Sequence, residues 1–149
     1  MKQRSLFVSI FISLFSIGCN SPKGHDAPLQ NEKAIEQIGC DLFTRFNNHD
    51  WEGMANLYSD SAVFLDPSFG KEGVIQTKKQ TIEKYNQLQI LFPDIRDDVK
   101  NFYTTGNHVI VEFVSSGTDS TGAQIKLPIV TVFTIEKGKI IRDATYYDL

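Results

Sequence analysis

In the first half of the chain, hydrophobic residues recur at the spacing of α-helices. Over residues 30–48, apolar side chains return every three or four positions and charged side chains occupy the opposite face, which predicts a long amphipathic helix. Asp50 is a suitable N-cap for a second, short helix that continues to Tyr58. A third helix is expected over residues 73–91, because Pro93 ends its apolar side.

The rest of the pattern indicates β-strands. A short β-prone segment covers residues 61–66, and after Pro93 apolar and polar positions alternate. The later strands are expected at residues 99–105, 108–116, 123–136 and 139–148. Turn residues such as Gly106 and Gly138 separate them, so consecutive strands should form antiparallel hairpins. Helices followed by hairpins predict an α+β fold, in which three N-terminal helices cover one face of a single sheet.

Strand alternation assigns side chains to the two faces of this sheet. One face should carry Val109, Val111, Phe113 and Ser115, then Ile129, Thr131, Phe133 and Ile135, and finally Ile141, Asp143, Thr145 and Tyr147. The opposite face is also partly apolar, with Ile110, Val114, Val130 and Val132. Two interpretations are equally open: a homodimer packed sheet to sheet, or scattered apolar residues exposed to water.

The N-terminus resembles a bacterial lipoprotein signal. Lys2 and Arg4 precede an apolar run at residues 6–18, and these 13 residues are too few to cross a membrane. The run ends in small or apolar residues before Cys19, as in a lipobox. We expect residues 1–18 to be removed, Cys19 to be lipidated, residues 19–29 to be a tether and residues 30–149 to form the domain. The alternative is an ordinary signal peptide in which Cys19 is incidental.

These assignments predict a location in the bacterial cell envelope, facing the periplasm or the exterior. Removal of Lys2 and Arg4 changes the formal charge from -3 to -5, so the lipid on Cys19 rather than anionic headgroups would hold the domain at the membrane. The negative charge also makes nucleic acid an unlikely class of partner.

Composition and residue spacing exclude several kinds of functional site. The chain has 149 residues, of which 41% are hydrophobic and 11% aromatic, enough for one domain with a substantial core. Cys40 lies in an apolar helix and is expected to be a small core residue, not a nucleophile. The three histidines are not at the spacing of metal ligands, and no glycine-rich phosphate loop is visible. Neither a metal nor a cofactor is expected.

Several short motifs resemble SnoaL-like proteins, within the superfamily of ketosteroid isomerases and nuclear transport factor two. They begin with residues 46–58 and Asp66-Pro67 and continue, in the family's order, to Gly138-Lys139-Ile140 and Tyr146-Tyr147-Asp148. The resemblance covers about residues 32–149. It implies a curved antiparallel sheet rolled into a cone around three helices, with a pocket for small ligands.

The resemblance also places candidate site residues. Asp66 matches the general base of ketosteroid isomerases, but Leu42 and Thr131 stand where that enzyme has its oxyanion-binding groups, and Leu42 cannot donate a hydrogen bond. Thr145 stands at the catalytic acid of the related cyclases and epoxide hydrolases, two residues after Asp143. Each enzymatic assignment therefore lacks a residue.

Two classes of function follow, and binding is favoured. The first is an exported, lipid-anchored domain that binds a small apolar or aromatic molecule. The residues expected around the ligand are Phe64, Tyr85, Phe113, Thr131, Phe133, Thr145 and Tyr147. The second is a cofactor-free isomerase, cyclase or hydrolase in which Asp66 is the general base, assisted by Asp143 or Tyr147. A third possibility is a structural protein whose cone is filled by its own side chains.

Both candidate acids have simpler interpretations as well. Asp66 would shape the turn before Pro67, and Asp143 would pair with Arg142 or Lys139 at the rim of the sheet. If Asp66 instead faces an apolar cavity, burial should raise the pKa of its carboxyl group.

Overall fold

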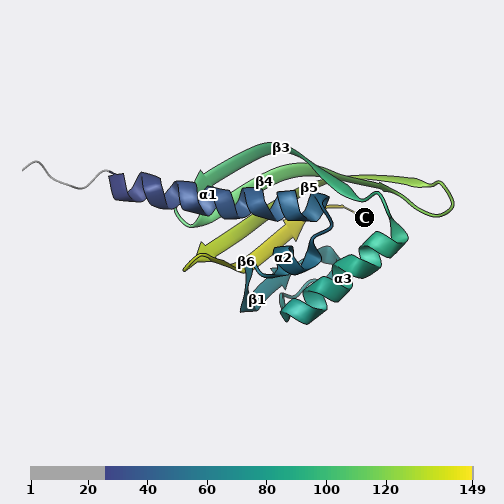
Figure 1. Cartoon of the computed structure of the whole chain (residues 1–149), viewed down its shortest axis with the longest axis horizontal. Coiled ribbons are helices and arrows are strands. Elements are labelled where there is room, and N and C mark those ends of the chain that lie inside the picture. Colours follow the sequence, from purple (N-terminus) through teal and green to yellow (C-terminus); the bar gives the residue numbers. More distant parts are fainter. Residues whose placement is uncertain (1–25, 149) are drawn as a thin grey trace, which may run out of the picture.

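A computed structural model describes residues 26–148 (Figure 1). The predicted signal peptide, the predicted lipidation site Cys19 and the first part of the predicted tether lie outside the described residues. Within them the elements follow the expected order, with helices first and long strands afterwards, so the α+β class is confirmed.

Three α-helices are present: α1 (Asp26–Asn47), α2 (Trp51–Ala55) and α3 (Lys78–Leu91). Helix α1 begins at Asp26, earlier than the start near residue 30 that hydrophobic spacing indicated. Asp50 caps α2 as predicted, because its side chain accepts a hydrogen bond from the Gly53 amide at 2.9 Å. Helix α3 begins later than expected, since Thr77 forms a capping box with Gln80.

The six strands form one sheet in the order β2-β1-β6-β5-β4-β3. Their bounds are β1 (Tyr58–Leu65), β2 (Val74–Ile75), β3 (Arg96–Thr105), β4 (His108–Thr118), β5 (Gln124–Glu136) and β6 (Lys139–Tyr146). A 3-10 turn, η1 (Pro67–Phe69), follows β1. Tyr58 therefore starts a strand instead of ending the second helix, and β2 occupies part of the segment assigned to the third.

The expectation of an all-antiparallel sheet is wrong for one pair of strands. The meander from β3 to β6 is antiparallel throughout, but β1 and β6 are parallel neighbours. A parallel pair needs a long connection, and here α3 and the strands β2 to β5 separate its two members along the chain. Short-range turn signals therefore carried no information about this pair.

Helix α1 lies across β3 and β4, while α2 and α3 pack together near β1 and β6 (Figure 1). Phe43 packs edge to face on Phe113, with ring centroids 4.9 Å apart, which joins α1 to the sheet. Gly39 of α1 also faces the sheet, and the space there suits a glycine, since a Cβ would lie 2.5 Å from the Phe102 ring. Cys40 is exposed, so its predicted core position is wrong: its neighbour Gly39 faces the sheet instead.

Strand alternation placed the inward face correctly in the two central strands. Val109, Val111 and Phe113 are buried, as are Thr131 and Phe133. In β6 the alternation is interrupted, because the register with β5 shifts between Thr134 and Ile135. As a result Ile140, and not the predicted Ile141, is buried on the side of Asp143.

Candidate functional site

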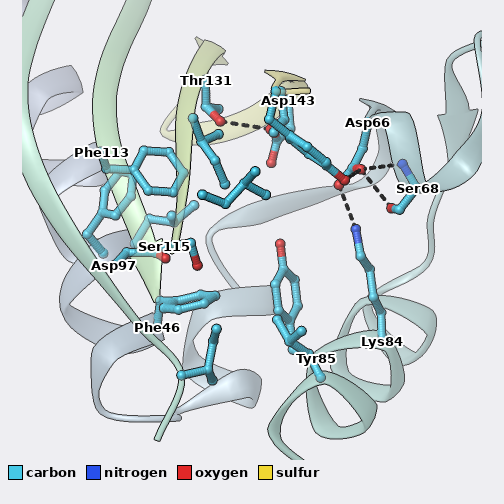
Figure 2. Close-up of a pocket in the computed structure, with 18 of the residues that line it drawn as sticks. Phe46, Asp66, Ser68, Lys84, Tyr85, Asp97, Phe113, Ser115, Thr131 and Asp143 are labelled. Atoms are coloured by element: carbon cyan, nitrogen blue, oxygen red, sulfur yellow. Dashed lines mark hydrogen bonds and ion pairs between the residues drawn. The ribbon is translucent and has the colours of Figure 1, made fainter. Parts of the chain in front are cut away.

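A cavity of about 220 Å³ lies between the helices and the inward face of the sheet (Figure 2). Its wall is mainly apolar and combines residues of α1, α3 and the strands β4 and β5. The apolar side chains of the wall are Leu42, Phe43, Phe46, Leu88, Ile95, Phe113, Ile125, Leu127, Ile129 and Phe133. The cone is therefore open inside, and a cone filled completely by its own side chains is excluded.

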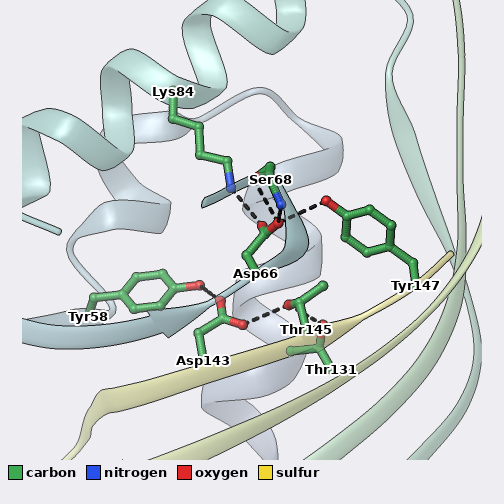
Figure 3. A network of polar contacts seen from close by, with 8 residues as sticks. All are labelled: Tyr58, Asp66, Ser68, Lys84, Thr131, Asp143, Thr145 and Tyr147. Carbon is green, nitrogen blue, oxygen red and sulfur yellow. Dashed lines mark hydrogen bonds and ion pairs between the residues drawn. The ribbon is translucent and has the colours of Figure 1, made fainter. Parts of the chain in front are cut away.

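Asp66 lies at one end of the cavity, where four donors surround its carboxylate (Figure 3). The Lys84 ammonium donates to Oδ2 at 2.7 Å, and the Tyr147 hydroxyl donates to Oδ1 at 2.8 Å. The Ser68 amide and hydroxyl also donate to Oδ1, at 2.8 and 2.7 Å, because Asp66 is the N-cap of η1. The predicted role of Asp66 in shaping this turn is thus present, within a larger polar cluster.

The expected rise in the pKa of Asp66 is wrong. Burial alone would raise the pKa, but the charge of Lys84 and the hydrogen bonds from Lys84 and Ser68 outweigh it, and the pKa lies below its ordinary value. Asp66 is therefore an ionised carboxylate at neutral pH. On the other side of the same contact, burial and the bond to Asp66 raise the pKa of Tyr147 to about 12.

Asp143 forms a second polar cluster in the cavity wall (Figure 3). Tyr58 donates to its Oδ2 at 2.7 Å and Thr145 donates to its Oδ1 at 2.9 Å, while Thr131 and Thr145 are joined at 2.7 Å. Burial raises the pKa of Asp143, although the bonds from Tyr58 and Thr145 oppose the rise. Asp143 is buried, so the alternative of an ion pair at the rim of the sheet is wrong.

Asp97, at the start of β3, is a third carboxyl group on the cavity wall. It is buried, with 6% of the residue exposed, and lies opposite Ser115 in the register between β3 and β4. Burial raises its pKa to about 7, against the effect of the Ser115 hydroxyl. The sequence interpretation missed Asp97 because it started this strand at residue 99.

Among residues 26–148, every residue predicted for the catalytic or ligand-binding site lines the cavity, except Phe64. The Phe64 ring is buried behind the wall and packs against Tyr58, with ring centroids 4.9 Å apart. Besides Asp97, the prediction missed Lys84 and Tyr58. Lys84 lies three positions after the buried Thr81 and four before Leu88, which lines the cavity, so a helical-wheel view of α3 would have pointed to it.

Within residues 26–148 no three His, Cys, Asp or Glu side chains come together as metal ligands would. Nor is any helix in this part of the chain both long and apolar enough to span a membrane.

A cone-shaped sheet with a pocket beneath its helices defines the fold class of nuclear transport factor two and the ketosteroid isomerases. The sequence model of the SnoaL-like domain matches residues 41–143, so the chain belongs to the SnoaL-like domain family. No curated protein matches the sequence.

Solved structures with the same fold include enzymes. SalBIII, an epoxide hydrolase/cyclase-like enzyme in pyran ring formation in the polyether salinomycin, has a TM-score of 0.70 and 21% identity over 80% of this chain and 95% of its own. An LEH-like epoxide hydrolase of M. tuberculosis has a TM-score of 0.67 and 14% identity, over 79% and 85%. A Catenulispora acidiphila protein with a ketosteroid isomerase-like fold, in complex with trimethylamine, has a TM-score of 0.67 and 16% identity, over 76% and 86%. At these identities the likeness concerns the fold.

Proposed function

We propose that this chain is a binding domain for a small, largely apolar molecule held in the cone pocket. The observation that carries this proposal is the combination of an open, mainly apolar cavity with a candidate base, Asp66, whose carboxylate already accepts four hydrogen bonds. The cavity lies below the roughly 300–1,000 Å³ of drug-sized sites, which favours a ligand of one ring with a short substituent.

The alternative is a cofactor-free isomerase, cyclase or hydrolase with Asp66 as general base, and the enzymes among the solved relatives support it. The geometry favours it less. A general base works best with a pKa near the working pH. The ion pair with Lys84 instead helps to lower the pKa of Asp66, which moves it further from neutral pH. Thr145 donates to Asp143 and is joined to Thr131 by a second hydrogen bond, so neither hydroxyl is free to replace a missing catalytic group.

Binding is tested by filling the pocket. Ile129 lines the cavity from β5, so Ile129→Trp should occupy the ligand's space and lower the affinity for single-ring aromatic compounds by about tenfold or more, measured by calorimetric titration. Lys126 lies on the outer face of the same strand and is exposed, which makes Lys126→Trp the matched control. If wild type binds none of these compounds, or if both variants bind like wild type, the proposal is refuted.

Asp66→Asn separates the two functions. Removing the negative charge leaves Lys84 unpaired in a half-buried position, so we expect a loss of about 1–3 kcal/mol of stability and little change in the affinity for a neutral aromatic compound. Asp60→Asn is the control, because the ion pair between Lys78 and Asp60 is exposed. If Asp66→Asn retained its stability but abolished a proton-transfer reaction of the wild type, the enzyme would be the correct alternative.

Export and lipid anchoring through Cys19 complete the proposal. Their support is the charged start, the short apolar run and the small residues before Cys19. Cys19→Ser should leave the precursor unprocessed or release the domain into the soluble fraction of a bacterial host. Unchanged processing and unchanged membrane fractionation of this variant would contradict the assignment.

A further inference from the structure

Asp97 is the carboxyl group of the cavity that the protein does not satisfy. Its Oδ1 atom is buried and has no hydrogen-bond partner among the described residues. A buried carboxyl oxygen without a partner costs free energy, so such groups are uncommon in folded proteins and indicate a missing partner. In the same cavity, by contrast, both carboxylate oxygens of Asp66 and both of Asp143 accept hydrogen bonds.

The position of Asp97 is fixed by its backbone. The Asn47 side chain, at the end of α1, donates to the Asp97 carbonyl at 2.8 Å and accepts from the Asp97 amide at 2.7 Å. These two bonds hold the start of β3 against α1, and the side chain then projects into the cavity beside Ser115 (Figure 2). A ligand group that meets Asp97 would therefore find it already oriented.

The cation of the cavity wall is not available to Asp97. Lys84 is bonded to Asp66 at the opposite end of the pocket, with the Tyr85 ring in the space between, while the Phe113 ring lies at the end of Asp97 (Figure 2). Asp97 thus faces an apolar, aromatic space, with Ser115 as its polar neighbour. Aromatic rings attract cations to their faces, so this end of the pocket suits a positive charge on the ligand.

We propose that the ligand is a small organic amine, whose ammonium group donates to Asp97 and whose apolar body lies against Phe113 and Leu127. This inference rests on the proposed binding function and names the ligand's chemistry. An ammonium group supplies both the donor that Oδ1 lacks and the charge that an ionised carboxylate needs when it is buried.

A neutral ligand fits the same end less well. A hydroxyl group would supply one hydrogen bond to Asp97 but no charge, which leaves the carboxylate buried and uncompensated. With the pKa of Asp97 raised to about 7, both protonation states are present at neutral pH, and an adjacent ammonium would stabilise the ionised one.

The experiment compares two probes of nearly equal shape at neutral pH. 2-Phenylethylamine carries an ammonium group where 2-phenylethanol carries a hydroxyl, and both are titrated calorimetrically into the purified protein. We expect the amine to bind about tenfold or more tightly than the alcohol. If the alcohol binds as well as the amine or better, this inference is overturned while the proposed function stands. If neither probe nor any other single-ring compound binds, the proposed function itself fails.

Two variants assign the preference to Asp97. Asp97→Asn keeps the shape of the side chain and removes its charge, so it should abolish the advantage of the amine and leave the alcohol's affinity within a small factor of wild type. Asp98→Asn is the matched control, because Asp98 is exposed and pairs with Lys100 outside the cavity. A preference for the amine that survives in Asp97→Asn overturns the assignment. The wild-type comparison of the two probes decides the inference even if that variant fails to fold.

Discussion

At the scale of single residues, the same pocket moves the pKa values of Asp66 and Asp97 in opposite directions. Both carboxyl groups lose solvent, which raises a carboxyl pKa. Asp66 meets Lys84 and Ser68, and their charge and hydrogen bonds more than reverse the effect. Asp97 meets only Ser115, so the effect of burial persists. The direction of a carboxyl pKa shift in this cavity is therefore decided by the hydrogen-bond donors and charges around the group, and not by its burial alone.

The raised pKa of Asp97 predicts a pH dependence of stability. Because the folded protein keeps this proton up to a pH of about 7 while the unfolded chain releases it near the ordinary carboxyl pKa of 3.8, the contribution of Asp97 to the free energy of unfolding should fall as the pH rises through that interval. Above a pH of about 7 the contribution of Asp97 to the free energy of unfolding no longer changes with pH. The ionisable side chain facing Asp97 from α3 is Tyr85, whose pKa is raised well above its ordinary value by burial, so it stays neutral throughout.

The measurement is urea unfolding of wild type and Asp97→Asn between pH 4 and 8. The stability of wild type relative to the variant should decrease by on the order of 3 kcal/mol between pH 4 and 7. A difference that is independent of pH would show that Asp97 titrates as an ordinary surface acid.

At the scale of elements, the segment after α3 is fastened to the end of β4. Asp94 accepts a hydrogen bond from the Thr118 amide at 2.6 Å, and Gly117 allows the close approach of Phe92 and Ile95. A Cβ on Gly117 would lie 2.9 Å from the Cβ of Phe92 and 3.2 Å from Cδ1 of Ile95. Since a Cβ position is fixed by the backbone, the segment itself would have to move.

We therefore expect Gly117→Ala to destabilise the protein by about 1–3 kcal/mol, despite the smaller backbone entropy of the unfolded variant. Ser116→Ala is the control, because Ser116 is half-buried on the other face of the same strand. Chemical denaturation of both variants provides the comparison. Equal stability of Gly117→Ala and wild type would mean that the segment can shift without cost.

The sequence predicted the kind and order of most elements because each depends on local periodicity and turn residues. It did not predict the parallel pairing of β1 with β6, which depends on contacts between distant segments. Bulges had a similar effect: the shift in register beside Ile135 moved Ile140 into the core in place of Ile141. Local patterns set the alternation within a strand but not the point where it changes phase.

The candidate site was predictable to the extent that a motif or a strand face marked its residues. Asp66 was found from its place before Pro67, and Phe113, Thr131 and Phe133 from alternation. Lys84 lay on a helix that had been considered only for its apolar side, and Asp97 lay outside the predicted strand. Extending the alternation backward from Val99 would have placed Ile95 and Asp97 on one face, where both are buried.

At the scale of the whole molecule, the outer face of the sheet keeps exposed apolar residues. Val130 and Tyr146 are neighbours across β5 and β6, and they are 38% and 51% exposed. Tyr103, on β3, is 50% exposed. Of the two interpretations that the sequence left open, we propose the first: two copies pack sheet to sheet over this face.

Val130→Arg should then convert a dimer into a monomer, since a charge would be buried at the centre of the contact. Glu136→Arg, at the exposed end of β5, is the control for the added charge. Sedimentation velocity distinguishes the two states. A monomeric wild type at micromolar concentration would rule out the dimer.

The parallel pairing of β1 with β6 also has a consequence for the speed of folding. Strand β6 lies between β1 and β5, so the sheet remains in two parts until residues 139–146 are in place. Contacts between segments so far apart in sequence carry a large loop-closure entropy and slow the search for the native topology. Nearly all of the domain must therefore be synthesised before the pocket can form, which accords with the export that we propose, because a chain crosses a membrane before it folds.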